Sequence, residues 1–518
     1  MSTDATSGAL PPNQRLTRGE VLKRGALFAA GAFALPALSA CGSDDDSGAD
    51  TTAGPATTTA NSTASTTAET SDTTGAGTAG STADTTAGST ADTTAATTAG
   101  TTANTTADTT DTSDGGLSAD SIATIQKFMG DVDPKFAGTG ETWDIGGIFP
   151  FSGTGASYGE VMGNGVKLAV RHIEQLGGPK INVDFRDHAN SDPVKTKNAF
   201  LAFEKLPAVI SSYEVGGLIV KDLIEKNHNL TIDPGGGNAP PGDKLPYFWG
   251  MRANFGFDGF KLAGTYLAQQ LKKPKVVLVF YNVGAVSDTY INAATLSMEA
   301  GGAEIVNVVK PQYGTTDFSN ELTAIRASGD FDAVSLGLAG NDIATFLKQY
   351  KTSGIDKPIV TWDGMVAPIA KIAGADVYEG VYLGGVDDFS VNSANPWAQE
   401  FIKSYKATYS DNGFPGASPD FNSAGYYNAT FLLWRLYRDV KAAGGDVNDG
   451  EQLQAALVAN PKSVGVIGGD AEAAGIAEFD VVSHGLKHQP MGFYRVEDGA
   501  PVPLATSDIG GADIKIIA

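Results

Sequence analysis

The sequence has little cysteine and comparatively few basic residues, and both shortages exclude several classes of function. Cys41 is the single cysteine among 518 residues, which excludes an intramolecular disulfide framework, a cysteine-type zinc site and an iron–sulfur cluster. The 36 basic residues are outnumbered by 59 acidic ones, which argues against a nucleic-acid-binding protein, because such a protein needs a basic surface to release phosphate counterions. The apolar run Gly25–Ala37 is shorter than the roughly 20 residues of a membrane-spanning helix.

The negative charge is unevenly distributed along the chain. Residues 1–42 carry four basic and two acidic residues, whereas residues 43–117 carry eleven acidic residues and no basic one. Nearly half of the net charge of −23 therefore falls in one short stretch. The region 118–518 is only mildly acidic and is long enough to bury a large core, which we expect to form two lobes.

The N-terminal region has the layout of an export signal. A basic segment ends at Arg24, the apolar run follows, and Leu-Ser-Ala-Cys-Gly stands at positions 38–42. This order resembles a bacterial lipobox, which implies that residues 1–40 are a signal peptide and that Cys41 becomes the lipidated N-terminus. The alternative is an ordinary leader that happens to contain a cysteine. Gly19 follows Arg18 where a twin-arginine motif would have its second arginine, so both export routes stay open.

Residues 41–117 are expected to form a disordered tether. They are built from repeats of Thr, Ala, Ser, Gly and Asp, and Leu117 is their only apolar residue larger than alanine or proline. Such a segment cannot bury enough surface to offset the entropy lost on ordering. It would hold the folded region 118–518 away from the outer face of the bacterial membrane, and its threonines are candidate glycosylation sites.

From Thr142 onward, short β-branched runs alternate with helical patterns, which predicts parallel sheets covered by helices on both faces. The alternation occurs twice, so the fold class predicted is α/β with two doubly wound lobes. The predicted strands are Trp143–Phe149, Ile181–Arg186, Ala208–Ser211, Leu230–Ile232, Val276–Tyr281, Ile305–Val309, Ala333–Leu336, Ile359–Thr361 and Val381–Leu383. The predicted helices are Val161–Leu176, Pro193–Lys205, Gly217–Asn227, Gly259–Leu271, Ile291–Ala300, Phe318–Ala327, Ile343–Thr352 and Pro368–Ala373.

Loops rich in glycine and hydroxyl residues follow many of these strands. They include residues 150–159, 211–217, 233–238, 282–288, 338–342 and 362–364. Ligands of doubly wound sheets bind beyond the carboxyl ends of the strands. Backbone N–H groups at helix starts suit a polar or anionic group there, although any one such loop is also explained as a tight turn.

Three segments of the sequence resemble the substrate-binding proteins of ABC importers, of the branched-chain amino acid type with the type I periplasmic-binding fold. They are DIGGIFPFSGTGASYGEVMGNGVKLAVRHIEQLGG at 144–178, DFRDHANSDPVKTKNAF at 184–200 and TTDFSNELTAIRASGDFDAV at 315–334. The resemblance implies a monomeric clamp that closes on a small molecule and delivers it to the permease subunits. It implies three crossings between the lobes, near Arg252–Phe257, Gly385–Phe389 and His484–Gln489. Lobe 1 would comprise about 142–254 and 388–485, and lobe 2 about 255–387 and 486–518.

The same resemblance implies a set of ligand-binding positions and no cofactor. Tyr158 matches a tyrosine of the first loop and Asp363 an acidic position of the second lobe. Four positions that bear hydroxyls in the family carry Val215, Gly237, Val286 and Ala339 here, unless the alignment slips by one residue and Ser212, Tyr213 or Asn238 substitutes. The complete set of expected ligand-binding residues is Ser152, Tyr158, Tyr213, Val215, Gly235, Gly237, Asn238, Tyr281, Val286, Ala339 and Asp363.

The lost hydroxyls bear on the ligand, because each missing hydrogen bond to a charged group costs roughly 1.5–3 kcal/mol. We therefore expect a ligand that is bulkier and less polar than a branched-chain amino acid, with a polar or cationic group facing Asp363. A ligand sensor that signals to a receptor is an alternative use of the same fold.

An enzyme is a further alternative, because residues 155–159 match G-x-S-x-G, the nucleophile elbow of α/β-hydrolases. Asp480 and His484 would complete the order Ser, Asp, His. However, Ser157 lies well past the end of its strand, and Asp480 and His484 are too close in sequence to occupy separate loops. The five histidines are scattered, so no metal site is expected.

Overall fold

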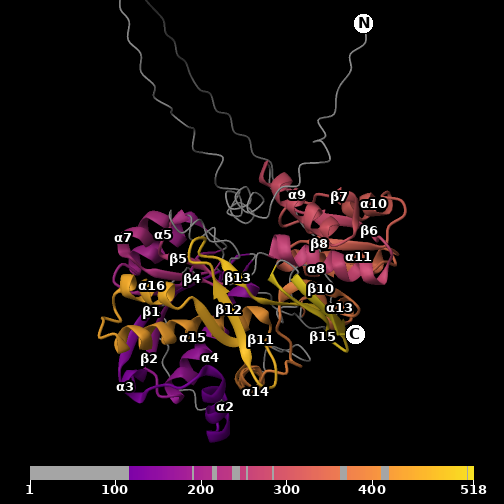
Figure 1. Cartoon of the computed structure of the whole chain (residues 1–518). Coiled ribbons are helices and arrows are strands. Elements are labelled where there is room, and N and C mark those ends of the chain that lie inside the picture. The colour runs from indigo at the N-terminus through magenta and orange to yellow at the C-terminus, as the bar shows by residue number, and fades with distance from the viewer. Residues whose placement is uncertain are drawn as a thin grey trace, which may run out of the picture. The chain divides into compact units, whose positions relative to one another are not determined.

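The computed structural model describes residues 116–153, 155–189, 192–212, 219–235, 245–252, 255–282, 285–361, 370, 372–409, 419–509 and 512–517. Cys41, the leader and all of the tether before Gly116 lie outside these ranges. Figure 1 labels most of the helices and strands. Within the described residues, no helix has the length and apolar character needed to cross a bilayer.

The first sheet, sheet A, is entirely parallel and is buried on both faces. Alternate residues of its strands join different clusters. Ile145 and Phe149 pack with α4 (Ala156–Gln175) and α15 (Phe421–Ala442), whereas Ile148 packs with α5 (Pro193–Ala202) and α7 (Lys221–Asn227). Its strands, in spatial order, are β2 (Lys180–Asp187), β1 (Thr142–Phe149), β3 (Ala208–Ile210), β4 (Leu230–Asp233) and β5 (Phe248–Gly250). The helices are α4 (Ala156–Gln175), α5 (Pro193–Ala202), α7 (Lys221–Asn227), α15 (Phe421–Ala442) and α16 (Gly450–Ala459).

The second sheet, sheet B, is mixed. Five parallel strands are extended at β10 by three antiparallel strands from the end of the chain. In spatial order they are β16 (Ala512–Ile516), β15 (Ala500–Asp508), β14 (Pro490–Glu497), β10 (Tyr382–Asp387), β9 (Ile359–Thr361), β8 (Ala333–Gly337), β6 (Lys275–Phe280) and β7 (Glu304–Val309). The helices are α8 (Phe255–Gln270), α9 (Ala285–Ala300), α10 (Ser319–Arg326), α11 (Asn341–Thr352) and α13 (Ala375–Tyr378).

Sheet B is also covered on both faces. Val276 and Leu278 of β6 pack with α8 and α9, while Val277 and Val279 pack with α10 and α11. The predicted fold class of two doubly wound α/β lobes is confirmed, with sheet B mixed rather than purely parallel. The strands predicted for the two sheets begin within one residue of those observed.

Several elements were not predicted from the sequence, including β5, β14, β15, β16, α15 and α16 described above. A small antiparallel sheet C contains β11 (Lys462–Gly469), β12 (Ala474–Phe479) and β13 (Leu486–His488), and α14 (Pro396–Tyr409) precedes α15. Two helices precede sheet A, namely α2 (Ala119–Met129) and α3 (Pro134–Ala137).

The chain passes between the sheets at three places. It goes from β5 of sheet A to α8 and β6 of sheet B, returns after β10 to α14 and α15, and enters sheet B again at β14.

Helix α15 packs along α4 so closely that a Cβ atom on Gly165 would lie 2.2 Å from the carbonyl oxygen of Ser423. The limits of the lobes given above stay a prediction.

Candidate ligand-binding site

The expected site lies at the carboxyl ends of the parallel strands. Ser152 follows β1, Gly235 follows β4, Tyr281 follows β6 and Ala339 follows β8. Val286 belongs to α9, and its side chain lies outside the described residues, as do Tyr213, Val215, Gly237, Asn238 and Asp363. The assignment of these residues to a ligand stays a prediction.

Tyr158 connects loops of the two sheets. It lies in the first turn of α4, follows β1 of sheet A and is only 6 % exposed. Its hydroxyl accepts a hydrogen bond from the backbone N–H of Gly340, which follows β8 of sheet B, at 2.7 Å. The carboxyl-end loops of the two sheets are therefore in direct contact at this point.

On sheet B, Tyr281 is fixed by the loop that carries Gly340. The hydroxyl of Tyr281 accepts from the N–H of Ala339 at 3.0 Å and donates to Oδ2 of Asp342 at 2.9 Å. The same Oδ2 accepts from the N–H of Gly314 at 2.8 Å. Burial raises the pKa of Asp342, and burial with the nearby Asp342 charge raises that of Tyr281 well above its usual range.

On sheet A, the hydroxyl of Ser152 is held by a charged group. It donates to Oδ2 of Asp187 at 2.5 Å, and Lys195 Nζ lies 3.0 Å from the same carboxylate. Burial alone would raise the pKa of Asp187, but the hydrogen bonds from Ser152 and Ala189, together with the ammonium of Lys195, lower it. The proton of the Ser152 hydroxyl is thus already used within the protein.

Ser212 is similarly engaged. Its hydroxyl donates to the carbonyl of Ile148 at 3.1 Å and lies 2.8 Å from Nε2 of His188. Burial lowers the pKa of His188 to about 4, which keeps the imidazole neutral at pH 7.

The loop after β4 begins with a buried aspartate. Asp233 is fully buried, and its Oδ1 accepts from the N–H of Gly235 at 2.9 Å. This local turn fixes the start of the glycine-rich segment 235–237, of which only Gly235 is described.

A buried polar cluster ties together the three connections between the sheets. Oδ1 of Asp387 accepts from Nε2 of Gln489 at 2.9 Å, and its Oδ2 lies 3.9 Å from Nε of Arg252. All three residues are at most 5 % exposed. Burial raises the pKa of Asp387 to about 6, although Arg252 and Gln489 act in the opposite direction.

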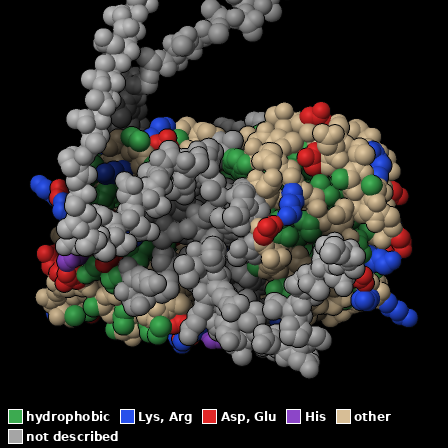
Figure 2. Space-filling view, turned by 90° about the horizontal axis from the view of Figure 1, so that it is seen from above, with side chains coloured by type: hydrophobic (Ala, Val, Ile, Leu, Met, Phe, Trp, Pro, Cys, Tyr) green, Lys and Arg blue, Asp and Glu red, His purple; other side chains and the backbone are tan. Residues whose placement is uncertain are grey.

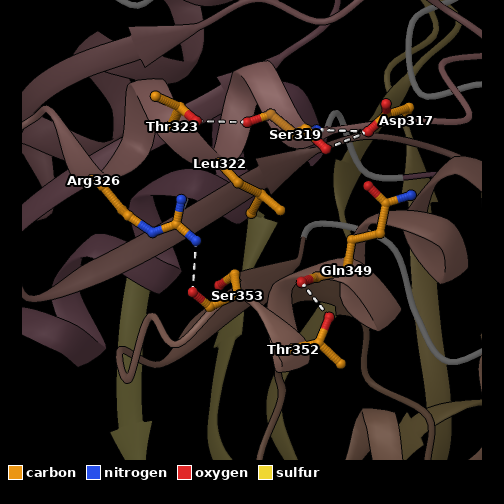
Figure 3. Close-up of a pocket in the computed structure, with 8 residues that line it drawn as sticks. All are labelled: Asp317, Ser319, Leu322, Thr323, Arg326, Gln349, Thr352 and Ser353. Carbon is orange, nitrogen blue, oxygen red and sulfur yellow. Dashed lines mark hydrogen bonds between the residues drawn. The ribbon is translucent and has the colours of Figure 1, made fainter.

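A hollow of about 350 Å³ is lined by residues of α10, of α11 and of the segments next to them (Figure 3). Its polar side chains are bound locally, since Asp317 accepts from Ser319, and Thr323 and Thr352 donate to backbone carbonyls of their own helices. Arg326 donates to the carbonyl of Ser353. Several of the polar groups that line the hollow therefore already have partners within the protein.

Two residues of the hydrolase alternative, Asp480 and His484, have structural roles, whereas the side chain of Ser157 lies outside the described residues. Oδ1 of Asp480 accepts from the N–H of Val482 at 2.8 Å, and the ring of His484 stacks on Trp249 with centroids 3.7 Å apart. Nδ1 of His484 faces the carbonyl of Phe248 at 3.3 Å.

Among the described residues, no group of three or more His, Cys, Asp or Glu side chains is placed to hold a metal ion. On the face seen in Figure 2, acidic and basic side chains are interspersed.

Comparison with known families places the chain in a class. The family model described as periplasmic binding protein matches residues 142–500, which is more than half of the chain, so the chain belongs to this family. Leu/Ile/Val-binding protein homolog 8 of Brucella abortus is 24 % identical over 291 residues, covering 53 % of this chain and 72 % of that protein. Homolog 1 of Brucella melitensis is 26 % identical over 327 residues, covering 60 % and 81 %.

Solved structures show the same fold. The branched-chain amino acid transporter substrate-binding protein LivJ from Streptococcus pneumoniae, in complex with isoleucine, aligns with a TM-score of 0.59 and 22 % identity, covering 71 % of this chain and 99 % of LivJ. A solute-binding protein of an ABC transporter from R. palustris, in complex with benzoate, aligns with a TM-score of 0.59 and 22 % identity, covering 72 % and 98 %.

The chain is therefore a solute-binding protein with the type I periplasmic-binding fold, in a family that acts outside the cytoplasm, and it is not an enzyme. The predicted family is confirmed. Sequence analysis placed Gly340 and Asp342 in a glycine-rich loop after a predicted strand, and Asp187 and His188 in a segment that carries the family resemblance, but it assigned none of these four residues to the site.

Proposed function

We propose that this protein is an extracytoplasmic solute-binding lipoprotein that delivers a small organic ligand to an ABC permease by closing its two lobes. The observation that carries the proposal is the meeting of carboxyl-end loops from both sheets at Tyr158 and Gly340. Ligands of doubly wound sheets bind at such strand ends, so the ligand would lie between the lobes. The protein would act as a monomer without a cofactor.

The ligand class follows from the residues at the strand ends. The hydroxyls of Ser152 and Ser212 donate to protein groups, and Val215, Gly237, Val286 and Ala339 carry none. Such a site favours a ligand bulkier or less polar than leucine, with a cationic or polar group at Asp363. The structural relatives include one bound to isoleucine and one bound to benzoate, which supports an amino acid or an aromatic acid.

Thermal unfolding in the presence of a panel of compounds tests this assignment. Leucine, valine, isoleucine, phenylalanine, tryptophan and benzoate form the panel. We expect a bulkier member to raise the midpoint of unfolding most, because a ligand that binds only the native state stabilises it. Stabilisation by leucine or valine alone would contradict the refinement, and no stabilisation by any member would contradict the ligand class.

A variant at Asp363 separates the two kinds of ligand. Asp363→Asn should abolish stabilisation by amino acids, whose ammonium group would lose its counter-charge, and should leave stabilisation by benzoate intact. Asp356→Asn is the control, since this exposed carboxylate lies in the turn before β9.

The membrane anchor is tested separately. Cys41→Ser should release the protein from the membrane fraction of an expressing bacterium, because the thiol that would carry the lipid is lost. Ser43→Ala lies just beyond the motif and should leave the protein membrane-bound. Membrane association of Cys41→Ser equal to that of the unaltered chain would contradict the anchor.

A further inference from the structure

The hydrogen bond between Tyr158 and Gly340 is made by the protein with itself, across the two sheets. It joins residues 182 positions apart, is 2.7 Å long and is buried. Residues of both sheets, including Tyr158, Tyr281 and Ala339, belong to one apolar cluster. A hydrogen bond in such surroundings is poorly screened and is costly to leave unmade.

The N–H of Gly340 is held in place from both sides. Gly340 has φ 59° and ψ −141°, a backbone conformation that side-chain-bearing residues rarely adopt. Tyr281 binds the N–H of the preceding residue, Ala339, and Asp342 follows two positions later with its carboxylate on Tyr281 and on the N–H of Gly314. The donor is thus positioned by a buried network that belongs entirely to sheet B and its loops.

We propose that Tyr158 is an interlobe latch: its hydroxyl holds the two lobes together by accepting the Gly340 N–H, and Tyr281 and Asp342 are positioning residues that aim this N–H. The inference rests on the proposed function, because it takes closure of the lobes to be the binding motion. The latch biases the chain toward its closed arrangement, so a ligand spends less of its binding free energy on closing the lobes.

The expected size of the effect follows from the net strength of one hydrogen bond. Removing it should lower the ratio of closed to open molecules about two- to tenfold. The apparent affinity for a ligand that binds the closed form falls as the closed fraction falls.

The test measures the distance between the lobes without any ligand. Spin labels are attached in the full-length chain through Val194→Cys on α5 and Leu296→Cys on α9, in a Cys41→Ser background that removes the single native thiol. Both label positions are well exposed, at 68 % and 57 %. The distance distribution between the labels then reports the closed and open fractions directly.

Tyr158→Phe should shift this distribution toward longer distances. Tyr350→Phe is the matched control, because it also removes the hydroxyl of a buried tyrosine, one that donates to the carbonyl of Lys357 at 3.0 Å within the second lobe. It should leave the distances unchanged. An unchanged distribution in Tyr158→Phe, or an equal shift in Tyr350→Phe, would overturn the proposal.

A double-mutant cycle separates positioning from general loosening and does not depend on Tyr158→Phe alone. Tyr281→Phe should also lengthen the distances, since the Gly340 N–H loses its alignment. In the Tyr158→Phe background the same change should have no further effect, because its target is already gone. Additive effects of the two changes would overturn the positioning role.

The two proposals fail in different ways. A ligand panel that stabilises nothing contradicts the proposed ligand class while leaving the label distances informative. Conversely, label distances insensitive to Tyr158→Phe contradict the latch while leaving ligand binding untouched.

Discussion

In each of the two sheets, a carboxylate fixes a loop at the carboxyl ends of the strands, but the surroundings shift the pKa values of the two carboxylates in opposite directions. On sheet A, the carboxylate of Asp187 binds Ser152 and is paired with Lys195, so its pKa is lowered. On sheet B, Asp342 has a tyrosine hydroxyl and a backbone N–H as partners, and burial raises its pKa. The comparison teaches that a strand-end loop can be fixed either by an ion pair at a wetter edge or by hydrogen bonds in a drier one.

The largest expected effect concerns the cluster that joins the two sheets. Arg252→Leu should lower the free energy of unfolding by about 3–5 kcal/mol at pH 8, because it leaves the buried carboxylate of Asp387 without its counter-charge. The loss should be smaller at pH 5, where Asp387, with a pKa of about 6, is largely protonated already. Urea unfolding at the two pH values measures both quantities.

The control for this change is an ion pair at the surface of sheet B. Arg495 lies 3.5 Å from Glu497, and both side chains are 45 % exposed. Arg495→Leu should change the free energy of unfolding by less than about 1 kcal/mol. Equal losses from the two substitutions would contradict the role assigned to the buried cluster.

The raised pKa of Asp387 also predicts how the free energy of unfolding depends on pH. Because its folded-state pKa is raised, the native protein binds this proton more tightly than the unfolded chain does. The resulting stability is fully present below about pH 4 and is lost as the pH rises through about 6. Asp387→Asn should remove this component from a plot of unfolding free energy against pH.

An effect of intermediate size is expected when a glycine in each sheet is replaced by alanine, which compares how tightly the two sheets are packed. A Cβ atom on Gly337 of β8 would lie 2.1 Å from the ring of Phe280, whereas one on Gly146 of β1 would lie 3.1 Å from Phe203. Gly337→Ala should therefore cost about 1–3 kcal/mol of unfolding free energy, and Gly146→Ala clearly less. Equal midpoints of urea unfolding would contradict the tighter packing of sheet B at this position.

The smallest effect sharpens the contrast between the two strand-end carboxylates. Asp187→Asn should lower the free energy of unfolding by about 1 kcal/mol at pH 7. The pKa of Asp187 is lowered in the folded protein, so the stability that its carboxylate contributes is present above about pH 4 and is lost as the pH falls. Asp342→Asn should cost less at pH 7, since its raised pKa marks stability lost as the pH rises. Thermal midpoints at pH 7 and pH 3.5 compare them, and equal pH profiles would remove the contrast.

The fold was largely predictable, and the exceptions have local causes. The parallel strands are continuous β-branched runs because both faces are buried, as in β6 with its sequence Lys-Val-Val-Leu-Val-Phe. Strand β5, Phe248–Gly250, has no β-branched residue, unlike the equally short strands β3 and β9, which were predicted. Strand β11 was missed because it contains glycines, which are unusual in strands. Gly465 is required by tertiary packing, since a Cβ atom at this position would lie 2.0 Å from the side chain of Asn428.

The site was less predictable. Tyr158 was singled out by its motif, but nothing near Gly340 in the sequence indicates that its N–H binds a tyrosine 182 residues away. The contact of Ser152 with a ligand stays a prediction, and nothing in the sequence near Ser152 indicates that its hydroxyl proton is donated to Asp187, 35 residues later. Such pairings depend on the register of neighbouring strands and on loop geometry, which composition and periodicity do not encode.

The sequence by itself predicted the export signal and the acidic low-complexity tether. It also determined the alternation of strands and helices that leads to two doubly wound lobes. These features depend on composition and on hydrophobic periodicity, which are local properties of the chain. Only the tertiary structure decided that Arg252, Asp387 and Gln489 meet between the sheets and that Tyr158 reaches Gly340. The physical reason is that a buried polar group must find its partner wherever packing brings one, and that partner is seldom a neighbour in sequence.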